Sequence, residues 1–175
     1  MTSAAMADDS ELCLSCGLCC TGEIFEHVRL GDDEVEGARA LRLPVVHGTD
    51  RSAFAQPCPH NVERACGVYE QRPRACRAFE CHTLKAHRAG EIDRATAAAR
   101  IERLRSAARA VRAGLPGELA SLGLWAAVAR FSDGGEGQGE GASQAAAWRA
   151  QHAGVLLDIL ALERLCRRDF ASREG

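Results

Sequence analysis

Eight cysteines in the first half of the chain are the residues whose type and spacing could do chemistry. They form two groups, first Cys13, Cys16, Cys19 and Cys20, then Cys58, Cys66, Cys76 and Cys81. Thiolates are soft ligands for zinc and iron, and four of them satisfy one tetrahedral ion or the corners of an iron–sulfur cluster. The pattern therefore predicts a metal site and leaves open whether zinc or an iron–sulfur cluster occupies it.

A disulfide framework explains these cysteines less well than a metal site does. The segment 1–9 has neither the basic nor the apolar region of a secretory signal, and no apolar run is long enough to span a bilayer. We therefore expect a cytoplasmic protein, and thiols are kept reduced in the cytosol. The total of nine cysteines is also odd, so a full set of disulfides would leave one thiol over.

The number of metal centres stays open at this point. Two-residue spacing lets two sulfurs of one loop reach the same centre, and Cys13, Cys16 and Cys19 show it twice. Cys19 and Cys20 are adjacent, so their side chains tend to point apart and rarely serve one mononuclear metal. The pattern fits two centres, or one centre with free thiols nearby. A bacterial ferredoxin run fails, because Glu23 stands where its fourth cysteine would be.

Arginines and histidines near the cysteines each have two possible roles. Arg64, Arg72, Arg74 and Arg77 either offset the negative charge of a thiolate site or are ordinary solvated charge. His60 and His82 could replace a sulfur ligand, but enough sulfur is present, so we expect them around the ligands or exposed. Cys166 lies on an apolar helical stripe and is expected to be a small core residue.

The first half of the chain must position these thiols with little regular structure. Gly17 allows the tight turn that brings neighbouring sulfurs together. Residues 23–30 predict a short strand, Gly31 or Asp32 begins a helix that stops before Pro44, and residues 44–57 predict a loop. Pro73 suits the first position of a helix, which would place Cys76 near a helix N-terminus that favours the thiolate. Cys81 follows five residues later, so either that helix bends or the two thiols bind from different sides.

The second half predicts helices with apolar stripes. One runs from Glu91 to Leu115, a second covers residues 117–131, and a third extends from Trp148 to Phe170. Each stripe must be covered by another element. The predicted fold class is therefore mainly α, with a cysteine-rich irregular metal-binding region, at most a short strand or hairpin, and C-terminal amphipathic helices packed on it.

The same patterns predict the domain organisation. Residues 1–11 are expected to be a disordered N-terminus, residues 12–90 a cysteine-cluster metal-binding domain, and residues 91–175 a helical region with a flexible linker at 133–143. The net charge of −2 and the few aromatic residues argue against nucleic-acid binding. We expect no membrane contact, and the C-terminal helices could bind a protein partner.

The two cysteine groups together form a longer signature, Cys13-x-x-Cys16-Gly17-x-Cys19-Cys20 followed by Cys66-x-Val68-Tyr69-x-x-Arg72-Pro73-x-x-Cys76-Arg77-x-Phe79-x-Cys81. Over residues 12–85 it closely resembles the CxxCxxCC cysteine-cluster family. The resemblance implies a zinc- or iron-chelating domain with the eight cysteines as ligands, framed by Tyr69, Arg72, Pro73, Arg77 and Phe79. Members of that family are often labelled iron–sulfur oxidoreductases, and the much longer flagellin lysine N-methylases look to share the domain.

Three hypotheses follow from the sequence. The first is a metal-chelating protein that holds zinc or an iron–sulfur cluster through the eight cysteines. The second is an iron–sulfur oxidoreductase or a cluster-dependent modifying enzyme, although no acid–base pair, nucleophile constellation or nucleotide-binding motif supports catalysis independently. The third is a structural metal knot that organises a helical protein-interaction module.

Overall fold

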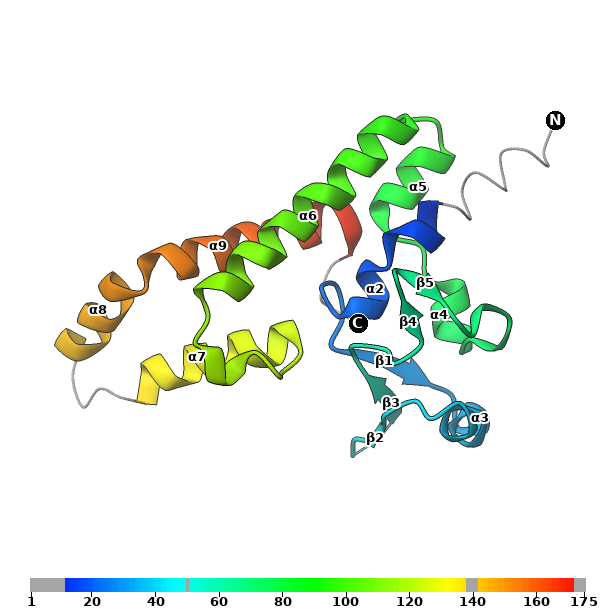
Figure 1. Ribbon diagram of the computed structural model, residues 1–175, viewed down its shortest axis with the longest axis horizontal. Helices are drawn as coiled ribbons and strands as arrows, with labels where there is room; N and C mark the ends of the chain where they lie inside the picture. Colours follow the sequence, from blue (N-terminus) through cyan, green and yellow to red (C-terminus); the bar gives the residue numbers. More distant parts are fainter. Residues whose placement is uncertain (1–11, 50, 138–141, 172–175) are drawn as a thin grey trace.

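The computed structural model describes residues 12–49, 51–137 and 142–171. The predicted disordered segment 1–11 and residues 138–141 of the predicted linker lie outside this part of the chain. Figure 1 shows a cysteine-rich part with short strands and helices beside a part built from longer helices. None of the described helices is long and apolar enough to cross a membrane.

The first cysteine group lies on two short helical turns separated by a glycine. Residues 12–16 are helical, and α2 follows at Leu18–Thr21. Gly17 between them has a φ of 66°, a left-handed conformation that glycine adopts without steric cost. The prediction that Gly17 makes the tight turn is confirmed.

A three-stranded antiparallel sheet follows, in the order β1-β3-β2. β1 is His27–Leu30, β2 is Val45–His47 and β3 is Ser52–Ala55. The predicted strand is confirmed at its C-terminal end, but the predicted loop at 44–57 is wrong because it contains two strands. Val45 pairs with Phe54, which is 1% exposed, and burial of this phenylalanine stabilises the hairpin. The turn-forming residues of this stretch had favoured irregular chain instead.

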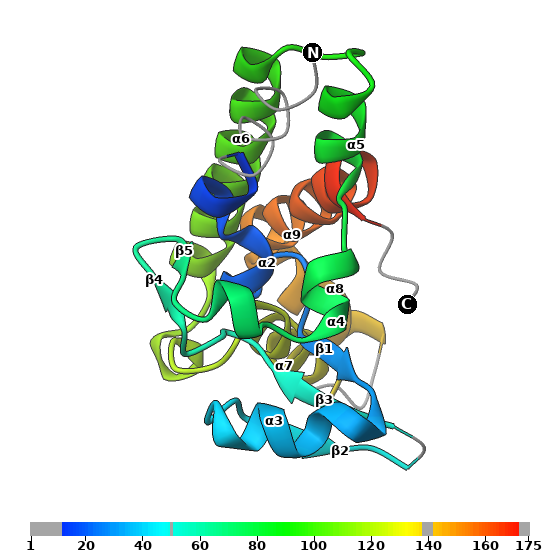
Figure 2. The same ribbon diagram turned by 90° about the vertical axis from the view of Figure 1, so that its right-hand side faces the viewer.

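The helix predicted after Gly31 is present as η1 at Asp32–Glu34 and α3 at Val35–Ala40. It packs beside the sheet (Figure 2). Its apolar side and the sheet bury a small hydrophobic cluster, which we call the sheet core, made of Leu30, Ala38, Leu43 and Phe54. The helix ends before Pro44, as predicted.

The second cysteine group is carried by several short elements in sequence. β4 at Asn61–Val62 and β5 at Ala65–Cys66 form a hairpin, followed by η2 at Tyr69–Gln71, α4 at Arg74–Ala78 and α5 at His82–Arg88. Pro73 is the residue before α4 rather than its first residue. Extended chain at Phe79 separates α4 from α5, so Cys76 and Cys81 belong to different elements.

The remaining chain forms α6 at Arg94–Gly114, η3 at Gly117–Leu119, α7 at Leu124–Gly137, α8 at Ala142–Gln151, α9 at Ala153–Leu165 and the π-helical turn η4 at Cys166–Phe170. The helix predicted at 117–131 is interrupted, since α7 begins only at Leu124. Within the linker predicted at 133–143, residues 133–137 belong to α7 and residues 142–143 belong to α8. The predicted helix from Trp148 to Phe170 is interrupted at His152.

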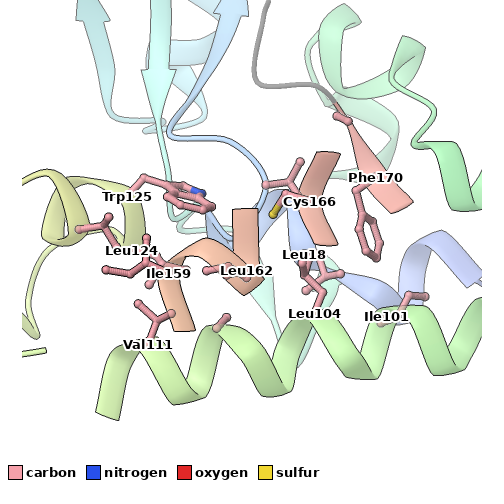
Figure 3. Close-up of a cluster of buried hydrophobic side chains, with 14 of the residues drawn as sticks. Leu18, Ile101, Leu104, Val111, Leu124, Trp125, Ile159, Leu162, Cys166 and Phe170 are labelled. Carbon is pink, nitrogen blue, oxygen red and sulfur yellow. The ribbon is translucent and has the colours of Figure 1, made fainter. Parts of the chain in front are cut away.

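The main hydrophobic core lies along α6 and joins both parts of the chain. Figure 3 shows Ile101, Leu104 and Val111 of α6 facing side chains from α9, η4, α7 and α2. Leu12, Leu18 and Ile24 of the first cysteine segment belong to this core. The predicted fold class is confirmed, since the protein is mainly helical with small sheets and the helices pack on the cysteine-rich region. The domain boundary at residue 90 stays a prediction.

Candidate metal centre

All eight clustered cysteines line one cavity of about 340 Å³. They come from residues 12–16, α2, the chain before β4, β5, α4 and the residue that precedes α5. The thiols surround the cavity rather than converge on one point: within the described ranges, no three Cys, His, Asp or Glu side chains are grouped as ligands of one ion. The structure thus brings together every residue of the two predicted groups.

The turn at Gly17 fixes where the first cysteine group lies against the second. A Cβ at Gly17 would be 3.1 Å from the Cα of Arg64, so any side chain there would force this backbone to move. Arg64 is in the two-residue turn between β4 and β5, and it and Glu63 both have positive φ, 75° and 48°. Such a turn twists the hairpin in the sense its strands require, at a cost of about 1–3 kcal/mol per non-glycine residue. Both sides of this contact line the cavity.

Burial favours the protonated form of several thiols of the cavity. It is the main cause of the raised pKa of Cys16 and Cys20, each to about 12, and of Cys76, to about 11, and charge on neighbouring thiols contributes to the same rise. Desolvation raises the pKa of the partly buried Cys19 well above its ordinary value. The expected preference for a thiolate at Cys76 is therefore outweighed by desolvation in the metal-free site.

Arg72 is the cation most closely associated with the cavity among the four arginines that the sequence singled out. Its guanidinium lies 3.7 Å from the centroid of the Tyr69 ring, and its charge lowers the pKa of both Cys13 and Cys76. The buried Nε of Arg72 has no hydrogen-bond partner in the described part of the chain. Arg64 also lines the cavity.

The other two arginines are engaged elsewhere. Arg74 lies 2.6 Å from a carboxylate oxygen of Asp33, and its backbone N–H donates to Glu34. Arg77 borders a separate hollow beside α3. These two are the ordinary surface charge that the sequence left as an alternative.

Arg105 of α6 is a residue of the site that sequence reasoning missed. Its guanidinium donates to the backbone carbonyl of Ser15 at 3.1 Å and to that of Cys16. Its charge also lowers the pKa of the Cys16 thiol, against the larger effect of burial. No local sequence signal points to Arg105, because it lies 89 residues after Cys16.

His27 of β1 lines the cavity, whereas His60, His82 and Cys166 do not. The Nε2–H of His60 donates to the carbonyl of Leu41 at 2.5 Å, and neither His60 nor His82 is among the residues around the cavity. Cys166 is fully buried in the main core. His152 packs against the rings of Phe131 and Trp148.

Comparison with known proteins bears on the same region. A sequence model of the CxxCxxCC family, described as a putative zinc- or iron-chelating domain, matches residues 12–101. No curated protein and no solved structure matches the chain. The matched region spans more than half of the 175 residues, contains all eight cysteines of the cavity and extends into α6. The chain belongs to the CxxCxxCC family.

Proposed function

We propose that this protein chelates metal and that its eight clustered cysteines are the ligands. The single observation that carries the proposal is the cavity lined by all eight thiols. Cysteines separated by up to 68 positions, from Cys13 to Cys81, reach this cavity from six segments of the chain. The lone ninth cysteine, Cys166, lies in the main core instead.

The surroundings of the cavity suit a thiolate-bound metal. Apolar side chains, including Leu18, Phe54 and Phe79, line it beside the thiols. Such a shell limits water access and raises the cost of an unpaired thiolate, so bound cations would supply the compensating charge. Metal binding would release protons, because the ligating form of cysteine is the thiolate.

The size of the cavity favours an iron–sulfur cluster over isolated zinc ions. Four thiolates around zinc lie at about 2.3 Å from the ion and leave no space between them. The cavity of about 340 Å³ far exceeds the ~10–15 Å³ that holds one water molecule. Clusters bring several irons and inorganic sulfides between their cysteines and would occupy more of this space than zinc ions.

An iron–sulfur cluster would supply one-electron chemistry, which is the basis of the alternative function as an iron–sulfur oxidoreductase. The residues of this chain would hold the cluster, shield it from water and offset its negative charge through Arg72 and Arg105. The apolar lining and these two cations support this alternative.

A structural metal knot is the second alternative. The segments that carry the first cysteines also place Leu12, Leu18 and Ile24 in the core shared with α6 and α9. A metal that fixes these segments would therefore also fix the helical part. The protein partner of the C-terminal helices stays a prediction, and Leu157 and Leu160 of α9 are exposed at 65% and 51%.

Metal analysis of protein purified without oxygen tests the proposed function. The wild-type chain and the Cys166→Ser variant should contain the same stoichiometric metal, since Cys166 lies outside the cavity. The Cys20→Ser/Cys58→Ser variant should contain less metal than the wild type. Equal metal in all three proteins, or none in the wild type, would refute cysteine chelation in this cavity.

A further inference from the structure

We infer that the eight cysteines form two separate four-sulfur centres with interleaved ligands. Centre A comprises Cys13, Cys16, Cys19 and Cys81, and centre B comprises Cys20, Cys58, Cys66 and Cys76. This division rests on the proposed metal-binding function and adds to it the number of centres and the ligands of each. The sequence left both points open.

Packing separates five of the eight thiols into two sets. Cys16, Cys19 and Cys81 pack against the main core along α6. Cys58 and Cys76 pack against the sheet core on the other side. The cavity therefore has one wall that belongs to each hydrophobic core, and each wall carries its own cysteines.

Backbone hydrogen bonds connect the ligands of centre B. The N–H of Cys58 donates to the carbonyl of Cys20 at 2.8 Å, which brings α2 beside the chain that enters β4. The N–H of Asn61 donates to the carbonyl of Cys58, and Asn61 pairs with Cys66 across the β4–β5 hairpin. Cys20, Cys58 and Cys66 thus lie in one hydrogen-bonded unit.

Centre A is formed by helical turns. Cys13 and Cys16 are three residues apart on the helical segment 12–16, so they share one face. Cys81 caps the N-terminus of α5, where its sulfur accepts a hydrogen bond from the N–H of Leu84 at 3.4 Å. Thr83 and Leu84 of α5 are buried beside this sulfur, which ties Cys81 to the main-core wall.

Helix geometry separates the two adjacent cysteines of α2. Cys19 and Cys20 are consecutive residues of α2, so a helix turns their side chains toward different walls.

The interleaving has a structural consequence. Centre A joins three cysteines of the first segment to Cys81, whereas centre B joins Cys20 to three downstream cysteines. Each centre therefore cross-links the same two stretches of chain. Arg72 lines the cavity that the two centres share.

Paired serine substitutions test the division by metal content, measured on protein purified without oxygen. Cys16→Ser/Cys81→Ser removes two ligands of centre A, and Cys58→Ser/Cys76→Ser removes two of centre B. Each should keep about half of the wild-type metal. The mixed variant Cys16→Ser/Cys76→Ser should lose nearly all of it, although it also replaces two cysteines. Cys166→Ser is the control and should keep the full amount.

A second measurement uses the wild-type chain and does not depend on how the variants fold. Metal is withdrawn in steps with a chelator, freed thiols are alkylated, and the labelled cysteines are located by mass spectrometry. The division predicts that the label enters one set of four before the other. Simultaneous labelling of all eight, or labelled sets that mix the two centres, would overturn it.

The two proposals fail in different ways. Wild-type protein without metal would overturn the metal-binding function together with the division. Wild-type protein with stoichiometric metal, in which the mixed variant keeps as much as the within-centre variants, would overturn only the division.

Discussion

Arg105, in the middle of α6, donates a hydrogen bond to the backbone carbonyl of Cys16, 89 residues earlier in the chain. The same guanidinium reaches the carbonyl of Ser15. The long helix thus holds the first cysteine segment through its backbone, and it places a positive charge beside a thiol of the cavity. Arg105 lies just beyond the matched family region, which ends at residue 101.

Replacing Arg105 with alanine should destabilise the protein by about 1–3 kcal/mol, because two backbone acceptors lose a charged donor. The Arg105 side chain is 14% exposed, so little water can replace it. Arg109→Ala is the matched control, since Arg109 is on the same helix, is 63% exposed and pairs with Glu102. Arg105→Ala should lower both the free energy of unfolding in urea and the metal content more than Arg109→Ala does. Equal effects of the two substitutions would contradict the role assigned to Arg105.

Replacing Gly17 with alanine should cost more than replacing another glycine of positive φ. Gly90 has a φ of 73°, and no heavy atom lies within 4 Å of the place that a Cβ would take, so Gly90→Ala should cost only the backbone strain, about 1–2 kcal/mol. Gly17→Ala adds the approach to Arg64 at 3.1 Å and should also lower the metal content. If the two variants unfold alike and both keep their metal, the contact between Gly17 and Arg64 does not position the site.

Asp169 should make the stability depend on pH. It is 2% exposed, and its carboxylate accepts hydrogen bonds from Arg168 at 2.8 and 2.6 Å, with Arg100 and Arg103 within 4.0 Å. The hydrogen bonds from Arg168 hold its pKa below the ordinary value of 3.8. This stabilisation is therefore present above pH 3.8 and is lost as the pH falls through the lowered pKa.

The Asp169→Asn variant should be less stable than wild type at pH 7 by about 1–3 kcal/mol, and the difference should shrink below the ordinary carboxyl pKa. Denaturant unfolding of both proteins between pH 7 and the acidic range measures this difference in the free energy of unfolding. Glu36→Gln serves as the control, because the Glu36 side chain is 86% exposed. A difference between Asp169→Asn and wild type that stays constant down to low pH would contradict the ion-pair account.

Removing the metal should lower the thermal midpoint, since the cavity lies between the two hydrophobic cores and short elements surround it. A structural metal adds its binding energy to folding. Calorimetry with and without a chelator under reducing conditions measures the shift, and limited proteolysis should then cut preferentially within residues 12–81. An unchanged midpoint would exclude a structural role for the metal.

The sequence predicted which cysteines lie together better than it predicted the sheet. Cysteine spacing is a local pattern, and all eight predicted cysteines line the cavity. The strands at 45–47 and 52–55 were predicted as loop, because Gly48, Thr49 and Asp50 dominate that stretch. What stabilises the hairpin is burial of Phe54 against Leu30 and Leu43, which is a tertiary effect.

Long-range contacts account for what sequence reasoning could not reach. The apolar stripe predicted for α6 is buried in the structure. This prediction succeeded because helical periodicity can be recognised within one segment of sequence. The contacts of Arg105 with Cys16 and of Thr83 with Asp169 join segments 89 and 86 positions apart. Residues 133–137 were predicted as linker for a related reason, because α7 continues into glycine-rich sequence as far as Gly137.

The most direct test of cysteine chelation is iron, zinc and acid-labile sulfide analysis, with a visible spectrum, on protein purified without oxygen. We predict a brown protein with iron and sulfide in matching amounts. Colourless protein with stoichiometric zinc would keep the chelating function but contradict the iron–sulfur assignment and the oxidoreductase alternative. Colourless protein with no metal would contradict the central claim that the eight cysteines are metal ligands.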